Sequence, residues 1–538
     1  MPSSRQYQGG KQPSLWLVFP AIFAAVLVAH LLLLRLPYYW DEAGYYIPAA
    51  YDFFRTGSLI PYSTLSNAHP PLPSLYLALW WKVFTFTPWV TRVAMCAISA
   101  VALLAVYRLA IITTNKPNVA AATVGLTALY PVWFAQSSLA HADMVAAAAT
   151  LWALAFFLEE RLWTAILCFS LAALAKETAI ITPLALAAWQ MWLCFAPNKS
   201  RPASNEPSPH SDAIKAGILL LPLIPLACWY IYHWHRTGFV FGNPEYLRYN
   251  ATATLTPLRI LLAFAHRVLH ITAHMNLFVP VLSMLACMML PPVEGRARIS
   301  FSHQLQFYVI ILANLILFSV LGGALLTRYL LPLYPLILLL CANTFYRRQK
   351  QWRYLVALSA VAFLVGLFIN PPYRFAPEDN LAYRDVILLH QAAIRQIEAH
   401  YPTATVLSAW PATDELNKPE LGYVEEPMQA ASIDNFSLPQ IERAAQLSET
   451  YTVGLIFSTK YDPPNLPFSL GRRNEALDTR FFDFHRDLPP EMIARLLGGK
   501  VVWRAERQGQ WAAVLHFDRP QVATQTEHDH LPLHYNQP

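Results

Sequence analysis

Long apolar stretches separated by short polar segments occupy most of residues 15–370. A helix needs about 20 predominantly apolar residues to cross the hydrocarbon core of a bilayer, although about 17 suffice for a helix packed among others. On this criterion the sequence predicts about eleven transmembrane helices. They are expected near residues 15–36, 89–112, 119–136, 144–159, 162–175, 178–195, 216–234, 274–291, 306–325, 330–346 and 353–369.

The composition also favours a polytopic membrane protein. Hydrophobic residues make up 55% of the 538 residues and charged residues only 13%, which is too apolar for an ordinary soluble protein of this length. The formal net charge is +6, but basic residues such as Arg347, Arg348 and Lys350 lie at the ends of apolar runs, where they set membrane topology. We therefore expect the lipid bilayer as a partner and no nucleic acid.

The segment 72–86 decides which loops share a membrane face. It is short, follows several prolines and carries Trp80, Trp81 and Lys82, which suit the headgroup region. We therefore expect it at the interface, with the N-terminal tail, 1–14, in the cytoplasm. Most of the basic loops then lie in the cytoplasm, as the positive-inside rule requires. This threading predicts a multi-pass protein of the cell (inner) membrane.

The chain becomes more polar after residue 370. Residues 371–518 alternate polar helical stretches with short β-like runs, which is typical of a small α/β domain. The threading places this domain outside the cytoplasm, followed by a polar tail at 519–538. The predicted fold is an α-helical polytopic membrane domain over 15–370 with a small C-terminal α/β extracytoplasmic domain. Strands are expected near residues 405–410, 452–458, 501–504 and 512–517.

Nearly every ionisable motif falls on the outer face under this threading. Asp41 and Glu42 directly follow the first predicted span and open the first outer loop, 37–88. A carboxylate at headgroup depth is partly desolvated, which raises its pKa and makes it a competent base. An acidic pair that only marks the end of a helix fits the same residues, and both interpretations stay open.

Four further motifs share this face, each with a structural alternative. His69 precedes two prolines, which hold it in a rigid turn. Asp143 with His141 fits either a binding role or the orientation of the loop. Lys176 and Glu177 fit either a functional role or a simple ion pair at the corner between two spans. Arg328, next to Tyr329, fits either a snorkelling arginine or bidentate binding of phosphate.

The order of these motifs resembles the GT-C glycosyltransferases, and most closely the protein O-mannosyltransferases and the lipid A aminoarabinose transferases. The resemblance covers residues from about 15 to 346. It rests on D-E at Asp41, a glycine at Gly57, H-P-P-L at His69, S-x-x-x-H-x-D from Ser137 to Asp143, K-E at Lys176, and T-R-Y-L-L-P-L-Y-P from Thr327 to Pro335.

This resemblance implies transfer of a sugar from a polyprenyl-phosphate donor to an acceptor hydroxyl, with inversion at the anomeric carbon. The acceptor would be a glycolipid, a polysaccharide or a protein. Asp41 is then the expected base, with Glu42 beside it in the catalytic pair. The expected substrate-binding residues are His69, His141, Asp143, Lys176, Glu177, Arg328 and Tyr329, among which Arg328, Lys176 and His69 are expected to hold phosphate.

The chain departs from the aminoarabinose transferases at two positions. At position 44 this chain has a glycine where that group has an arginine, and at position 69 it has a histidine where that group has a lysine. The chain also has no insertion that fits the β-trefoil domain of the eukaryotic protein mannosyltransferases. These departures indicate a bacterial enzyme whose sugar and acceptor the resemblance does not assign.

The sequence does not demand a cofactor or a metal. All six cysteines lie in apolar runs, so neither a disulfide framework nor a zinc-ligand spacing is present. A divalent cation held by Asp41, Glu42 and Asp143 near a phosphate stays open. The alternative function is a multi-span transporter or lipid flippase without glycosyl transfer. Transporters usually place charges near the midplane and show repeated halves, and neither pattern is visible here.

Overall fold

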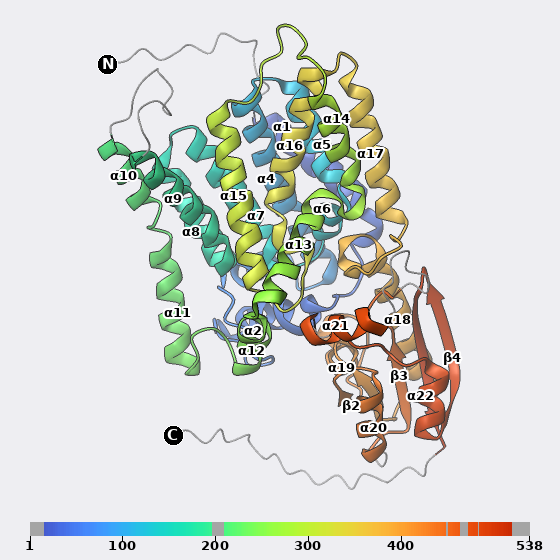
Figure 1. The fold of residues 1–538 in the computed structure, drawn as a ribbon. Helices are drawn as coiled ribbons and strands as arrows, with labels where there is room; N and C mark the ends of the chain where they lie inside the picture. Colours follow the sequence, from blue (N-terminus) through green and yellow to red (C-terminus); the bar gives the residue numbers. More distant parts are fainter. Residues whose placement is uncertain (1–14, 196–208, 448–449, 463–471, 483, 519–538) are drawn as a thin grey trace.

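We describe a computed structural model that covers residues 15–195, 209–447, 450–462, 472–482 and 484–518. The predicted tails at 1–14 and 519–538 lie outside these residues. A helical bundle forms one end of the molecule and a mixed sheet with its helices forms the other (Figure 1). This confirms the predicted class, a helical membrane domain followed by a small α/β domain.

The bundle contains most of the apolar runs found in the sequence. Several of its helices begin with proline at the first or second helical position, where the missing N–H costs nothing. The helices are α1 Leu15–His30, α4 Pro88–Thr114, α5 Pro117–Leu129, α6 Pro131–Gln136, α7 Ala142–Leu158, α8 Leu162–Ala175, α9 Ile181–Phe195, α10 Pro209–Ile218, α11 Leu223–Thr237, α13 Pro257–Thr272, α14 Phe278–Met288, α15 Phe301–Val320, α16 Leu333–Arg348 and α17 Trp352–Phe368.

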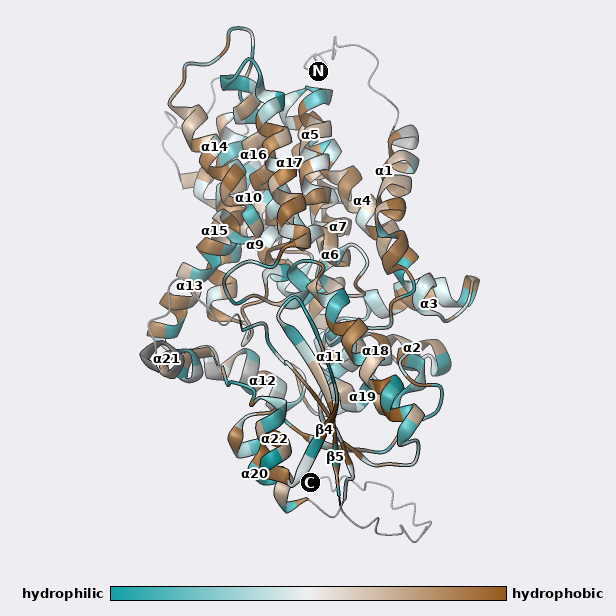
Figure 2. Ribbon diagram, turned by 90° about the vertical axis from the view of Figure 1, so that its right-hand side faces the viewer, coloured by the Kyte–Doolittle hydropathy of each residue, from teal (hydrophilic) through white to brown (hydrophobic). Residues whose placement is uncertain are grey.

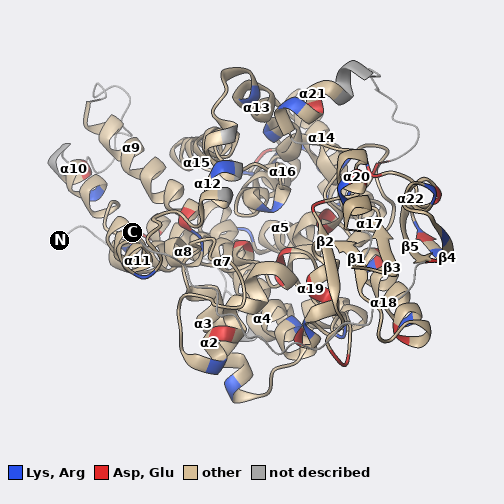
Figure 3. Ribbon diagram, turned by 90° about the horizontal axis from the view of Figure 1, so that it is seen from below, with Lys and Arg blue, Asp and Glu red and all other residues tan. Residues whose placement is uncertain are grey.

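The number of membrane crossings stays a prediction. Within the described residues, four helices are long and apolar enough to cross a bilayer, and a bent pair makes a fifth candidate. Five shorter apolar helices of 10–17 residues accompany them. Long stretches of the bundle helices carry no charged residue (Figure 3).

The bent pair differs from the expectation of a single helix over 274–291. The helix α13 lies within the bundle and packs against α15, and α14 turns away from it by 99°. The bend falls at Met275 and Asn276, which have left-handed φ angles of 48° and 65°. The backbone N–H of Met275 donates to the hydroxyl of Tyr373, 3.0 Å away. Because Tyr373 lies in the segment that follows α17, this hydrogen bond ties that segment to the break between α13 and α14.

The short helix α3, Leu72–Val83, lies across the lower end of the bundle (Figure 2). Its side chains Leu79 and Val83 are 62% and 65% exposed. An apolar, exposed helix in this position is arranged as an interfacial helix would be. Two other short helices, α2 Ile47–Thr56 and α12 Pro244–Asn250, lie at the same end of the molecule (Figure 1).

The C-terminal domain is built on a five-stranded sheet of order β2-β1-β3-β5-β4. Strand β1 runs parallel to β2 and β3, and β5 runs antiparallel to β3 and β4. The strands are β1 Val406–Ala409, β2 Ala430–Ile433, β3 Val453–Phe457, β4 Gly499–Arg507 and β5 Gln510–Phe517; the helices are α18 Ala382–His400, α19 Ala412–Asn417, α20 Leu438–Gln446, α21 Arg472–Phe482 and α22 Pro490–Leu497.

The four predicted β-like runs all correspond to strands of this sheet. The sequence gives no signal for β2, a four-residue edge strand that contains two alanines and a serine. Such residues have little intrinsic preference for a strand, so pairing with β1 decides their conformation. Strands β1 and β3 are buried along their whole length, as expected for the interior of a sheet covered on both faces.

Candidate active site

Glu42 begins a π-helix, η2 Glu42–Tyr46, directly after Asp41. Its side chain is fully buried. One carboxylate oxygen, Oε2, accepts hydrogen bonds from the N–H of Tyr39 at 2.8 Å and from Nη2 of Arg92 at 2.9 Å. The other, Oε1, accepts from Nη1 of Arg92 and from the N–H of Ala140. All four lone-pair positions of the carboxylate are therefore used within the protein.

Arg92 ties the loop around Asp41 to the bundle. Besides Glu42, its guanidinium donates to the carbonyl of Pro37 at 2.6 Å and to the carbonyl of Ser138 at 2.8 Å. Arg92 lies on α4, inside a run that the sequence predicts to cross the membrane. An arginine in such a run is a recognised functional signal, and it identifies a residue that the motifs do not include.

Glu42, expected beside Asp41 in the catalytic pair, faces the interior of the protein. Its carboxylate has neither solvent access nor a free lone pair for a substrate. The neighbouring Asp41 differs, since its side chain is 22% exposed.

Arg328 is the centre of the charged cluster. It lies in a short 3-10 helix, η7 Thr327–Leu330, and is buried. Its Nη2 donates to Asp41, its Nη1 donates to Oε2 of Glu378 at 2.5 Å, and its Nε lies 3.4 Å from Oδ2 of Asp143. Three carboxylates from distant parts of the chain therefore share one guanidinium.

Lys176 and Tyr329 complete the cationic side of this cluster. The Nζ of Lys176 donates to Oδ1 of Asp143 at 2.6 Å and lies 4.0 Å from the centroid of the Tyr329 ring. Such a position over an aromatic face is attractive for an ammonium group. Arg328 and Lys176 thus flank the two oxygens of Asp143.

His141 lies next to Arg328 as a neutral acceptor. Its Nδ1 lies 2.8 Å from Oε1 of Gln136, and an amide oxygen only accepts, so Nδ1 carries the proton. Its Nε2 lies 3.4 Å from Nη1 of Arg328. Burial, together with the charge of Arg328, holds the pKa of His141 well below its usual range.

A second group contains His69 and Glu177. The Nδ1 of His69 lies 2.9 Å from Oε2 of Glu177, and its Nε2 lies 3.2 Å from the hydroxyl of Tyr246. The ring of Tyr46 stacks 5.8 Å from that of His69 and lies 5.7 Å from that of His141. Tyr46 therefore joins this group to the Arg328 cluster.

The two residues of the K-E motif, Lys176 and Glu177, bond to different partners in the structure. Lys176 bonds to Asp143, and Glu177 bonds to His69. An ion pair between Lys176 and Glu177 themselves is therefore not what holds this corner. The two neighbouring residues point into two groups of the same site.

Glu378 is a member of the cluster that the motifs do not reveal. It lies in η8, Pro377–Asp379, in a segment that the predicted boundary at residue 371 assigns to the C-terminal domain. Its neighbour Asp379 bonds to Thr327 and lies 2.9 Å from Nε2 of His274. These contacts attach η8 to the bundle, and no pattern in the sequence indicates them.

Glu378 holds a proton more firmly than an ordinary glutamate. Burial, opposed by Arg328 and reinforced by Asp41, Asp379 and Asp143, raises the pKa of Glu378 to about 8. The cluster gathers more carboxylates than cations, and a proton on Glu378 relieves that imbalance.

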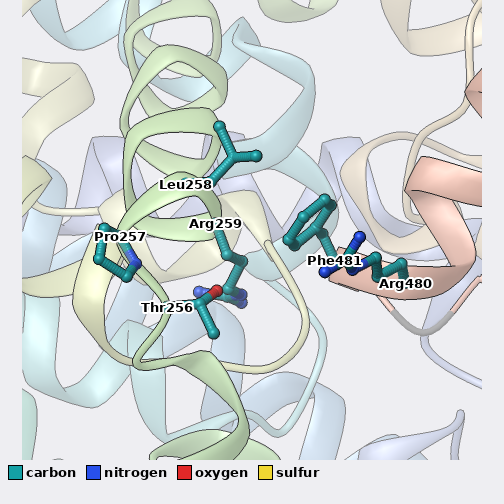
Figure 4. A pocket seen from close by; sticks show the side chains of 6 residues that line it. All are labelled: Thr256, Pro257, Leu258, Arg259, Arg480 and Phe481. Carbon is teal, nitrogen blue, oxygen red and sulfur yellow. The ribbon is translucent and has the colours of Figure 1, made fainter.

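Two features lie apart from the cluster. A cavity of about 310 Å³ opens between α13 and α21, with Arg259, Arg480 and Phe481 in its lining (Figure 4), and none of its lining residues belongs to the cluster. Among the described residues, no three or more His, Cys, Asp or Glu side chains are grouped to hold a metal ion. Glu42 in particular is bonded to Arg92, so it does not join Asp41 and Asp143 as a ligand.

The buried Glu42 pair makes a large difference to stability. Glu42→Gln is expected to lower the free energy of unfolding by about 3–5 kcal/mol, because it leaves Arg92 buried without its counter-charge. Denaturant unfolding in detergent micelles measures this value. Glu159→Gln is the matched control: its partner Arg108 is one-third exposed, so a loss of about 1 kcal/mol or less is expected. Equal losses at both positions would contradict the prediction.

The raised pKa of Glu378 predicts a pH dependence of stability. The folded protein keeps a proton on Glu378 between pH 4.5 and about 8, where the unfolded chain has lost it, so stability falls as the pH rises through this window. Glu378→Gln is expected to remove that decline. The measurement is the difference in unfolding free energy between wild type and variant at pH 5, 6, 7 and 8. A constant difference would show that Glu378 does not titrate in this range.

Comparison with known proteins supports the resemblance noted in the sequence. Residues 68–229 match the model of the family described as dolichyl-phosphate-mannose-protein mannosyltransferase. A comparison with curated proteins gives no match.

Solved structures share the fold at low sequence identity. ArnT from Cupriavidus metallidurans, bound to undecaprenyl phosphate, is 14% identical with a TM-score of 0.53, and the alignment covers 95% of this chain and 99% of ArnT. The apo form of ArnT is 14% identical with a TM-score of 0.49, and the alignment covers 93% of this chain and 98% of ArnT. The oligosaccharyltransferase AglB from Archaeoglobus fulgidus is 12% identical with a TM-score of 0.43, and the alignment covers 91% of this chain and 74% of AglB. Over residues 68–229 the chain is therefore similar to the mannosyltransferase family, and as a whole it has the fold of ArnT.

Proposed function

We propose that this protein moves a sugar from a polyprenyl-phosphate donor to an acceptor hydroxyl, with inversion at the anomeric carbon. The observation that carries the proposal is the set of groups around Arg328: a buried arginine, a lysine and a partly exposed aspartate at one end of an apolar bundle. The ArnT structure with the same fold contains undecaprenyl phosphate, which supports a lipid phosphate as the donor group.

Arg328 and Lys176 are the proposed phosphate ligands. A guanidinium matches two phosphate oxygens at once, and an ammonium adds a point charge. A phosphate is a good leaving group, so the main need in the transition state is neutralisation of the charge that develops on its bridging oxygen. In the free protein, carboxylates occupy both cations. Binding of the donor therefore exchanges carboxylate contacts for phosphate contacts.

Asp41 is the proposed base for the acceptor hydroxyl. Its side chain is 22% exposed, whereas those of Asp143 and Glu378 are only 3% and 4% exposed, so an acceptor reaches Asp41 most easily. In the free protein this carboxylate is bonded to Arg328. When a donor phosphate takes the guanidinium of Arg328, Asp41 loses that partner and becomes able to accept a proton.

The remaining site residues position these groups. We assign Glu42 to fixing the loop before Asp41, Asp143 to orienting Lys176, and Tyr329 to holding that ammonium by its ring. His141 orients Arg328 from its other side. His69 and Glu177, with Tyr246, form a polar group suited to the hydroxyls of a bound sugar.

The proposed location is the cell (inner) membrane, with the N-terminus in the cytoplasm and the site on the outer face. The C-terminal domain lies at the same end of the bundle as the site (Figure 1). The acceptor is a glycolipid, a polysaccharide or a protein. Transport or lipid flipping without transfer fits less well, because the charged groups lie at one end of the bundle and not at its middle.

Replacement of the proposed base tests the mechanism directly. Asp41→Asn is expected to lower kcat by about 10²–10⁴, the usual contribution of a general base. The assay uses purified protein in lipid with radiolabelled sugars on polyprenyl phosphate. Asp414→Asn is the control, since Asp414 is 25% exposed and also bonds to a cation, Lys418. Full activity of Asp41→Asn would remove Asp41 from the mechanism.

A change at Arg328 tests donor binding. Arg328→Lys keeps the charge but loses the planar fork, so the KM for the donor is expected to rise about 10- to 100-fold. Arg374→Lys, at an arginine that also bonds to two aspartates, is expected to leave donor KM unchanged. Folding of both variants is checked by thermal unfolding. An unchanged donor KM in folded Arg328→Lys would assign Arg328 to structure alone.

A further inference from the structure

The C-terminal domain is docked on the loop that carries Asp41. The N–H of Tyr38 donates to the carbonyl of Leu421 at 3.3 Å, and the hydroxyl of Tyr423 donates to the carbonyl of Tyr38 at 2.9 Å. These bonds join the start of the catalytic loop to the segment after α19. The domain is therefore part of the wall of the site and not a separate appendage.

Trp410, directly after β1, packs against the residues that flank Asp41 in the chain. Its ring lies 5.3 Å from that of Trp40 in an edge-on arrangement, and 5.9 Å from that of Tyr45. Trp40 precedes Asp41 in the chain, and Tyr45 follows it by four residues. The three rings are each only partly buried. Together they form a surface beside the proposed base, which we call the aromatic wall.

Gly44 is shaped to the Trp410 ring. A Cβ atom at Gly44 would lie 2.5–2.8 Å from three atoms of that indole, closer than real contacts allow. Any larger residue at position 44 would push the ring away from Trp40 and Tyr45. The glycine therefore lets the C-terminal domain bring its tryptophan into the catalytic loop.

Trp40 itself is held in an unusual conformation. Its φ angle is 47°, a left-handed value that bulky residues rarely adopt. Such strain persists only where surrounding contacts impose it, and it collects at functional sites. The strained backbone presents the Trp40 ring to Trp410 and leaves Asp41 facing Arg328.

We propose that Trp40, Tyr45 and Trp410 bind a pyranose ring of the acceptor, which makes the acceptor a glycolipid or polysaccharide. A sugar ring has an apolar face of C–H groups and a polar rim, so it stacks on aromatic rings that are partly open to water. This inference rests on the proposed function. Inversion requires the acceptor hydroxyl to attack opposite the phosphate, and the wall adjoins Asp41 while Arg328 holds the phosphate.

Binding without turnover tests this subsite. Saturation-transfer NMR on the full-length protein in nanodiscs uses methyl α-mannopyranoside and methyl β-glucopyranoside as probes. Ring-proton signals are expected with wild type and with Trp410→Phe, and about a tenfold weaker response is expected with Trp410→Ala. Trp163→Ala, at an exposed tryptophan on α8, is the control and is expected to keep the signals. Equal signals from Trp410→Ala and wild type would overturn the proposal.

A second pair of variants separates a binding role from a folding role. Gly44→Ala is expected to weaken glycoside binding by displacing the indole, and Gly44→Ala combined with Trp410→Ala is expected to bind no worse than Trp410→Ala alone. Additive losses would contradict the shared role. Binding of a serine-containing peptide, lost in Trp410→Ala, would also overturn a carbohydrate subsite. Because these measurements need no donor, a wild type without transferase activity would refute the proposed function and leave this subsite to be judged separately.

Discussion

The buried pair of Arg92 and Glu42 is the interaction on which the site depends. A guanidinium inside the apolar helix α4 is costly unless every charge is matched. Here the carboxylate of Glu42 and the carbonyls of Pro37 and Ser138 satisfy it. The same bonds fix the ends of two loops, one leading to Asp41 and the other to His141. The position of the Asp41 carboxylate, the proposed base, therefore follows from the need to neutralise one buried arginine.

The second constraint on this site is the balance between its carboxylates and its cations in the free protein. Arg328 has three carboxylate neighbours and Lys176 shares one of them, so negative groups outnumber positive ones. A proton on Glu378 reduces the excess. In the proposed reaction, a lipid phosphate would compete with these carboxylates for both cations, and donor binding would release Asp41 from Arg328.

The sequence anticipated much of this structure, for identifiable reasons. Apolar runs predict buried helices, and β-branched or aromatic runs predict strands, because both depend on neighbours close in the chain. Asp41, His141, Lys176 and Arg328 stand at the ends of such runs, so motif order was enough to select them. Motif order did not identify Arg92 and Glu378, since neither belongs to a motif. The pairing of Glu42 with Arg92 could not be anticipated either, because this partner lies fifty residues away, on α4.

What the sequence by itself determined is the membrane character of the chain, the class of each domain and the residue types available for chemistry. Only the tertiary structure decided the partners: Lys176 with Asp143, Glu177 with His69, and Trp410 against Gly44. Periodicity records which face of an element is buried. Pairing between side chains far apart in the chain depends on how the elements pack, and hydrogen bonds and ion pairs act only over a few ångströms.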